Sequence, residues 1–194
     1  MAQDVAAQET ADEIFDRKTA NAVTVKTGML GDTNTGKTSL MVKYVDGLFD
    51  MDYIETLGVN FMEKTVTIRN AEITFSVWDL GGSLEFAHML PLVCNEAAVL
   101  LFMFDLTRKV TLTSVRDWYR QARQLNKSAI PFLVGTKYDE FQTKSDHERQ
   151  EIVTLARKYA QAMKSPLIFT SAAASININK VFKIILHKVF HLKC

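Results

Sequence analysis

The stretch GDTNTGKT at residues 31–38 decides the fold, because it fits the pattern G-x-x-x-x-G-K-[ST] in full. An apolar run precedes it, and SLMVKY at residues 39–44 opens an amphipathic helix after it. Glycine lets such a loop turn its backbone N–H groups inward to phosphate oxygens, and the helix directs its positive end to the same anion. The predicted phosphate-binding residues are Gly31, Asp32, Thr33, Asn34, Thr35, Gly36, Lys37, Thr38 and Ser39.

Two side chains of this loop can serve a bound nucleoside triphosphate directly. Lys37 can reach the β- and γ-phosphates as a catalytic residue, and the Thr38 hydroxyl can ligate Mg²⁺. An ordinary glycine-rich turn is the weaker interpretation, because the pattern is complete and stands between a strand and a helix. The sequence therefore predicts a protein that binds a nucleoside triphosphate.

Strand-like apolar runs alternate with amphipathic stretches from residue 23 onward. Strands are predicted at residues 23–30, 62–69, 73–79, 98–105, 130–135 and 167–170. Helices are predicted at residues 36–46, 113–125, 147–162 and 177–192. This order is typical of an α/β fold with a mostly parallel six-stranded sheet and helices on both faces. A hairpin turn is predicted at Asn70, so the pair of strands that it joins is expected to be antiparallel.

Composition and charge exclude several classes of protein. Of 194 residues, 47% are hydrophobic and 23% are charged, which excludes a disordered chain. A formal net charge of +1 argues against a nucleic-acid-binding protein. Two cysteines imply no disulfide framework, and the absence of a long apolar run leaves a cytoplasmic protein as the expectation. Residues 1–22 have a net charge of −3 and are predicted to be a flexible acidic extension of a single domain at residues 23–194.

A second motif, DLGG at residues 79–82, follows an apolar strand and matches D-x-x-G. Asp79 is expected to hold Mg²⁺ through water, and the Gly82 N–H is expected to meet the γ-phosphate. Thr56 lies between the two motifs, and its hydroxyl can complete the Mg²⁺ shell only while the γ-phosphate is present. A loop built this way distinguishes triphosphate from diphosphate. Tyr53, which begins the same loop, is predicted to contact the nucleotide.

A third motif, TKYD at residues 136–139, indicates guanine rather than adenine. The Asp139 carboxylate can accept hydrogen bonds from N1–H and N2–H₂ of guanine, and adenine has no such pair of donors. Thr136 opens the motif, and the stem of Lys137 can lie along the base plane. Taken alone, this stretch would also fit a polar turn after a strand. Further nucleotide contacts are predicted at Phe49, which would otherwise be a core residue, and at Ser171, Ala172 and Ala173 near guanine O6.

These motifs together, over about residues 23–192, resemble those of the Ras superfamily of small GTPases, whose G domain is a P-loop NTPase fold. Four longer stretches are similar to the septum-promoting, mitotic-exit GTPase family. They are WDLGG (78–82), EFAHMLPLVCNEAAVLLFMFDLTRK (85–109), SVRDWYRQARQLNKSAIPFLVGTKYDEF (114–141) and SININKVFKIILHK (175–188). That family has TKxD where most relatives have NKxD, so Thr136 supports the narrower resemblance.

The resemblance implies a biological role. It implies a monomeric GTP/GDP switch that uses Mg²⁺ and is peripheral at the spindle pole body or centrosome, held there by a scaffold. It also implies that the switch recruits a protein kinase of the septation or mitotic-exit cascade. A TBC-type GTPase-activating complex is implied as the partner that turns it off.

Two residues depart from the family pattern. Thr33 occupies the phosphate-loop position where Ras itself has glycine, although Rab-like relatives have a small hydroxyl residue there. Ser83 follows D-x-x-G, where these GTPases usually have the glutamine that orients the attacking water. Serine is too short for that task, so we expect slow GTP hydrolysis without an activating protein. A TBC-type partner that supplies both an arginine and a glutamine would restore fast hydrolysis.

Three alternatives remain open at this point. A Rab-like trafficking GTPase would share the motifs, but no lipidation signal is evident at either terminus. A metabolic P-loop kinase would need an arginine-rich lid, which the sequence lacks. A scaffold that stays loaded with GTP would follow if Ser83 abolished hydrolysis. The apolar residues of 52–59 and 82–94 would form an effector surface in a switch, whereas in a plain domain they would pack inward.

Overall fold

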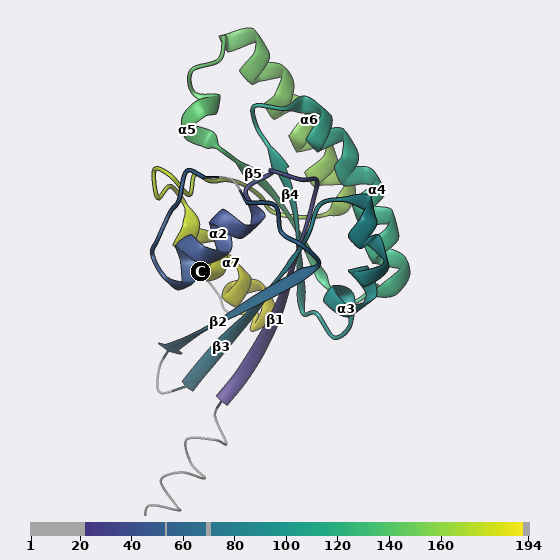
Figure 1. Cartoon of the computed structure of the whole chain (residues 1–194), viewed down its shortest axis with the longest axis vertical. Helices are drawn as coiled ribbons and strands as arrows, with labels where there is room; N and C mark the ends of the chain where they lie inside the picture. The colour runs from purple at the N-terminus through teal and green to yellow at the C-terminus, as the bar shows by residue number, and fades with distance from the viewer. Residues whose placement is uncertain (1–21, 53, 69–70, 192–194) are drawn as a thin grey trace, which may run out of the picture.

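The computed structural model describes residues 22–52, 54–68 and 71–191, which form a six-stranded sheet with helices on both faces (Figure 1). The strands are β1 (Ala22–Leu30), β2 (Val59–Ile68), β3 (Ala71–Leu80), β4 (Val99–Asp105), β5 (Ile130–Thr136) and β6 (Leu167–Phe169). The helical elements are α2 (Lys37–Val45), the 3₁₀-helix η1 (Leu84–Met89), α3 (Leu90–Cys94), α4 (Lys109–Leu125), α5 (Tyr138–Phe141), α6 (Asp146–Met163) and α7 (Ile178–Val189). The predicted α/β class is confirmed.

The strand order is β2-β3-β1-β4-β5-β6. β2 and β3 pair antiparallel, as predicted, and every other neighbouring pair is parallel. The predicted turn residue Asn70 lies outside the described residues. Parallel strands bring their carboxyl ends to one edge of the sheet, so the loops after β1, β3 and β5 meet there.

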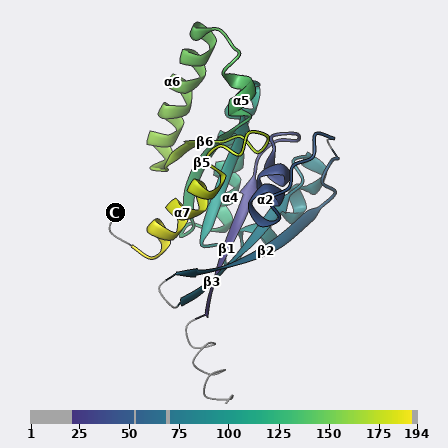
Figure 2. The ribbon, with the colours of Figure 1, turned by 90° about the vertical axis from the view of Figure 1, so that its left-hand side faces the viewer.

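The helices divide between the two faces of the sheet, as Figures 1 and 2 show from perpendicular directions. α2 and α7 cover one face, and α3, α4 and α6 cover the other. β4 is fully buried between them, and its side chains alternate between the two cores. Val99, Leu101 and Met103 belong to the α2–α7 core, and Leu100, Phe102 and Phe104 belong to the α3–α4–α6 core.

Several strands and helices begin at residues other than those predicted. β2 begins three residues before its predicted start at residue 62, and α4 begins four residues before its predicted start at residue 113. The sequence SDHE at residues 145–148 predicts a capped start for α6, and this prediction is confirmed, since Ser145 and Glu148 form a reciprocal capping box. η1, α3 and α5 are short elements that the sequence pattern did not predict. Of the predicted extension, only Ala22 is described, and it already belongs to β1. No helix among the described residues is both long and apolar enough to cross a membrane.

Candidate nucleotide-binding site

The phosphate loop joins β1 to α2 at the carboxyl edge of the sheet. Gly31 has φ 153°, and a Cβ at this position would lie 2.3 Å from the carbonyl oxygen of Met103 on the neighbouring strand. Gly36, with φ 76° in the left-handed region, is the N-cap of α2. Glycine is thus required at both ends of the loop, by close approach at the first and by backbone conformation at the second.

Lys37 lies inside the loop and is only 5% exposed. Its Nζ donates to the carbonyl oxygens of Gly31 at 2.9 Å and of Asp32 at 2.8 Å. Burial lowers the pKa of Lys37 to about 8, although Asp79 and Asp32 act in the opposite direction. Burial has removed most of the water around this ammonium group, and two carbonyl oxygens hold it in place. Phosphate oxygens can therefore supply the charge-assisted hydrogen bonds that water would otherwise provide.

The three predicted Mg²⁺ ligands converge. Thr56 Oγ1 lies 2.8 Å from Thr38 Oγ1 and 3.3 Å from Asp79 Oδ2, and Thr38 also donates to that carboxylate oxygen. The other oxygen, Asp79 Oδ1, is buried and has no hydrogen-bond partner among the described residues. Burial raises the pKa of Asp79, while Lys37 and the two hydroxyls oppose the increase.

This set of donors fits Mg²⁺, which prefers hydroxyl, carboxylate and water oxygens. The buried oxygen without a partner is the further sign that a cation belongs beside Asp79. When bound, Mg²⁺ would neutralise negative charge on the phosphates. Thr38 and Thr56 orient their hydroxyls to this point, and Asp79 supplies the negative charge.

The glycines of the second motif allow it to lie against the phosphate loop. A Cβ at Gly82 would lie 2.2 Å from the backbone nitrogen of Thr33, so no other residue fits without moving the loop. Gly81 donates its N–H to the Gly58 carbonyl at 2.8 Å, which joins this turn to the segment that carries Thr56. Ser83, next along the chain, caps η1 by accepting a hydrogen bond from the Glu85 N–H at 3.4 Å.

The base motif is tied to the phosphate loop through Thr136. The Thr136 hydroxyl lies 2.7 Å from the Thr35 carbonyl oxygen and 3.0 Å from that of Phe104. Lys137 has φ 56°, and its Nζ forms a 2.9 Å ion pair with Asp105. Asp139 lies half-buried in the first turn of α5, where a carboxylate is favoured.

The last predicted segment lies beside the base motif, because Tyr138 donates its N–H to the Thr170 carbonyl at 3.0 Å. Ser171 is buried, Ala172 is half-buried and Ala173 is exposed. Phe49 is 39% exposed, so it is not the core residue that the sequence left as an alternative. Tyr53 lies outside the described residues. The described segments therefore bring the phosphate, Mg²⁺ and base motifs to one edge of the sheet.

Three further residues contact this site that the motifs did not identify. Trp118 of α4 donates Nε1–H to Asp32 Oδ1 at 2.9 Å. Arg108, the N-cap of α4, contacts the loop carbonyls, and the buried Asp105 binds both Arg108 and Lys137. The only sequence signal for Asp105 is a carboxylate that ends an otherwise apolar strand.

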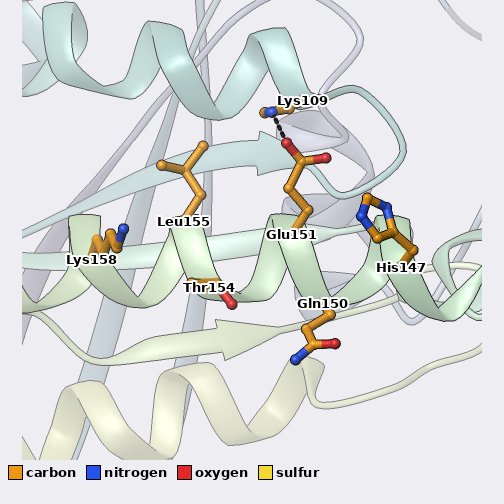
Figure 3. A pocket seen from close by; sticks show the side chains of 7 residues that line it. All are labelled: Lys109, His147, Gln150, Glu151, Thr154, Leu155 and Lys158. Carbon is orange, nitrogen blue, oxygen red and sulfur yellow. Dashed lines mark hydrogen bonds and ion pairs between the residues drawn. The ribbon is translucent and has the colours of Figure 1, made fainter.

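A separate groove of about 400 Å³ lies between the start of α4 and α6 (Figure 3). Lys109 and Glu151 form an ion pair across it, and His147 and Lys158 lie on the same side of α6. None of its lining residues belongs to the three motifs, so the groove is not part of the nucleotide site.

Comparisons with known proteins agree with this geometry. A model of the Ras family matches residues 26–191. Septum-promoting GTP-binding protein 1 from Schizosaccharomyces pombe is 62% identical over 174 residues, which cover 90% of this chain and 88% of the relative. Ras-related protein Rab-22A is 31% identical in Mus musculus and 30% identical in Homo sapiens, each over 81% of this chain and 79% of the relative. The chain therefore belongs to the Ras family of small GTPases, which bind GTP and GDP with Mg²⁺ and hydrolyse GTP.

Proposed function

We propose that this GTPase is a switch in septation and mitotic exit. The observation that carries the proposal is its 62% identity to a septum-promoting GTP-binding protein over nearly the whole of both chains. The Rab-22A proteins share only about half as much identity over a shorter region. We therefore favour septation over vesicle trafficking.

The effector of this switch, in our proposal, is a protein kinase that binds an exposed apolar surface. The switch surface consists of Ile54, Leu57, Phe61, Leu84 and Leu92, all of which are exposed. Its residues flank Thr56 and Gly82, which lie where the γ-phosphate is expected. Leu84 is 84% exposed, so this segment does not simply pack inward, although Phe86 and Met89 are half-buried. The exposure of these large apolar side chains supports a protein partner.

Two regulators complete the proposal. Because Ser83 stands where a water-orienting glutamine is expected, we propose that intrinsic hydrolysis is slow and that a TBC-type activating complex ends the signal. We further propose that this GTPase is cytoplasmic and that a scaffold holds it at the periphery of the spindle pole body or centrosome. The resemblance to the septum-promoting family supports both parts.

Replacement of the fission yeast relative by this chain tests the septation role. We expect cells that express this chain to form septa, whereas cells that express Rab-22A in its place do not. Thr38→Ala serves as the matched inactive control, because it removes a Mg²⁺-ligating hydroxyl without changing the switch surface. Failure of the folded, GTP-loaded chain to support septa would contradict the proposal, as would equal rescue by Rab-22A.

A further inference from the structure

The carbonyl groups of residues 31–35 all accept hydrogen bonds from side chains. Lys37 binds the first two carbonyls, and Thr136 binds the fifth. The third and fourth accept from Arg108, which is not part of any nucleotide-binding motif of this sequence. Arg108 stands 75 residues after the first of its two acceptors along the chain, at the start of α4.

Arg108 fixes the orientation of two peptide groups. Its Nη2 donates to the carbonyl oxygen of Thr33 at 2.9 Å and to that of Asn34 at 2.8 Å. In a planar trans peptide the C=O and the N–H of the next residue point in opposite directions. The two hydrogen bonds therefore turn the N–H groups of Asn34 and Thr35 away from Arg108, to the side of the loop where we expect the phosphates. Backbone N–H groups on that side are the ones that hold phosphate.

Asp105 holds the guanidinium in place. Its Oδ2 accepts from Arg108 Nε at 3.0 Å and pairs with Lys137 Nζ at 2.9 Å, while its Oδ1 accepts from the N–H and the hydroxyl of Thr107. The Asp105 side chain is fully buried. Burial alone would raise the pKa of Asp105, but the hydrogen bonds from Thr107, Lys137 and Arg108 hold it below its usual value. One ionised carboxylate thus binds a residue of the base motif and the residue that orients the phosphate loop.

We propose that Arg108 is a positioning residue for the phosphates of the bound guanine nucleotide. Its fork of N–H donors spans Asp105 and two loop carbonyls at once, and a compact ammonium cannot do this. Arg108 thereby aims two N–H groups of the loop at the phosphates. Through Asp105 it links the phosphate loop to the base motif, so loss of Arg108 weakens the retention of nucleotide.

The test compares Arg108→Gln with Arg116→Gln, a matched control in α4. The Arg116 side chain is 74% exposed, and its Nε lies 3.9 Å from Asp117 Oδ1 in a surface ion pair. Release of a fluorescent GDP analogue is followed at saturating Mg²⁺. We expect Arg108→Gln to release GDP at least about tenfold faster than the natural protein, which corresponds to about 1.4 kcal/mol, and Arg116→Gln to match the natural protein. Arg108→Lys keeps the charge beside Asp105 but lacks the fork, and we expect an intermediate rate.

A second readout separates positioning from a general loss of stability. The ³¹P resonance of the β-phosphate of bound GDP reports the N–H groups around it, so we expect it to shift in Arg108→Gln and stay unchanged in Arg116→Gln. If Arg108→Gln does not fold, Arg108→Lys carries the same test in both measurements. An unchanged GDP release rate and an unchanged resonance in the folded variants would overturn the proposal.

Discussion

Trp118 Nε1 donates a 2.9 Å hydrogen bond to Asp32 Oδ1, which joins the middle of α4 to the phosphate loop. The Trp118 side chain is buried, and 86 residues separate it from its partner. The same Asp32 carboxylate lies close enough to Lys37 to favour its charged form. The tryptophan therefore fixes a charge beside the buried lysine of the loop.

Removal of this donor is expected to weaken the domain measurably. Trp118→Phe keeps an aromatic ring in the core but loses the N–H, and we expect the free energy of unfolding to fall by about 1–2 kcal/mol. Urea unfolding at saturating GDP measures the change. A double-mutant cycle with Asp32→Ala isolates the pair. Additive effects of the two substitutions would mean that the hydrogen bond contributes nothing.

Thr136 has an equally specific task, because its hydroxyl reaches the Thr35 carbonyl from the base motif. Thr136→Val keeps the shape and removes the donor, which leaves a buried carbonyl without this partner. We expect a loss of about 1–3 kcal/mol in the free energy of unfolding and faster release of GDP. Thr136→Asn is the matched control, since its amide can donate to the same oxygen. Release of GDP from Thr136→Val at the natural rate would show that this contact does not position the loop.

Local patterns predicted the strands and the three motifs of the site. The phosphate loop, D-x-x-G and TKYD are each continuous in sequence, and each lies at or directly after the carboxyl end of a strand, at the same edge of the sheet. Because parallel strands end at the same edge of a sheet, prediction of a parallel sheet is enough to predict that the three motifs lie together. The capping box at Ser145 could be predicted for the same reason, since both partners lie within one turn.

Contacts between distant segments could not be predicted in this way. Arg108 and Trp118 reach the phosphate loop from 75 and 86 residues away, and no local pattern marks either as a partner of the loop. The early start of α4 has a related cause. Val110 and Thr111 are β-branched residues, which disfavour a helix. The Thr111 hydroxyl nevertheless accepts a hydrogen bond from the Asp105 N–H at 2.9 Å and donates one to the Arg108 carbonyl at 2.7 Å. These two hydrogen bonds stabilise the first turn of α4.

Ser83 is expected to limit intrinsic hydrolysis. Its hydroxyl caps η1 and is too short to orient a water molecule beside the γ-phosphate. We expect Ser83→Gln to speed single-turnover hydrolysis of preloaded GTP by about tenfold or more. Ser83→Ala removes the same cap without adding an amide, so we expect it to stay as slow as the natural protein. Equal slow rates for all three proteins would point to geometry elsewhere, such as Thr33, and equal fast rates would mean that another residue positions the water.

Thr56 is expected to distinguish GTP from GDP through Mg²⁺. Its hydroxyl already lies 2.8 Å from Thr38 Oγ1 and 3.3 Å from Asp79, but it belongs to a segment that is exposed on either side. Thr38 lies in α2 and Asp79 lies in β3, so both can hold Mg²⁺ with either GTP or GDP bound. Thr56→Ala should therefore weaken Mg²⁺ binding to the GTP-loaded protein by about tenfold, the scale of 1.4 kcal/mol, and leave the GDP-loaded protein nearly unchanged.

Titration of Mg²⁺ against the release of each nucleotide measures this difference. Thr38→Ala is the matched comparison, because it removes a hydroxyl from the same cluster on the fixed side and should weaken Mg²⁺ binding with both nucleotides. A Thr56→Ala variant that loses Mg²⁺ equally from the GTP and GDP forms would place Thr56 among the permanent ligands. In that case Mg²⁺ would not couple the segment that carries Thr56 to the γ-phosphate. The switch surface would then have to respond to the γ-phosphate through another contact.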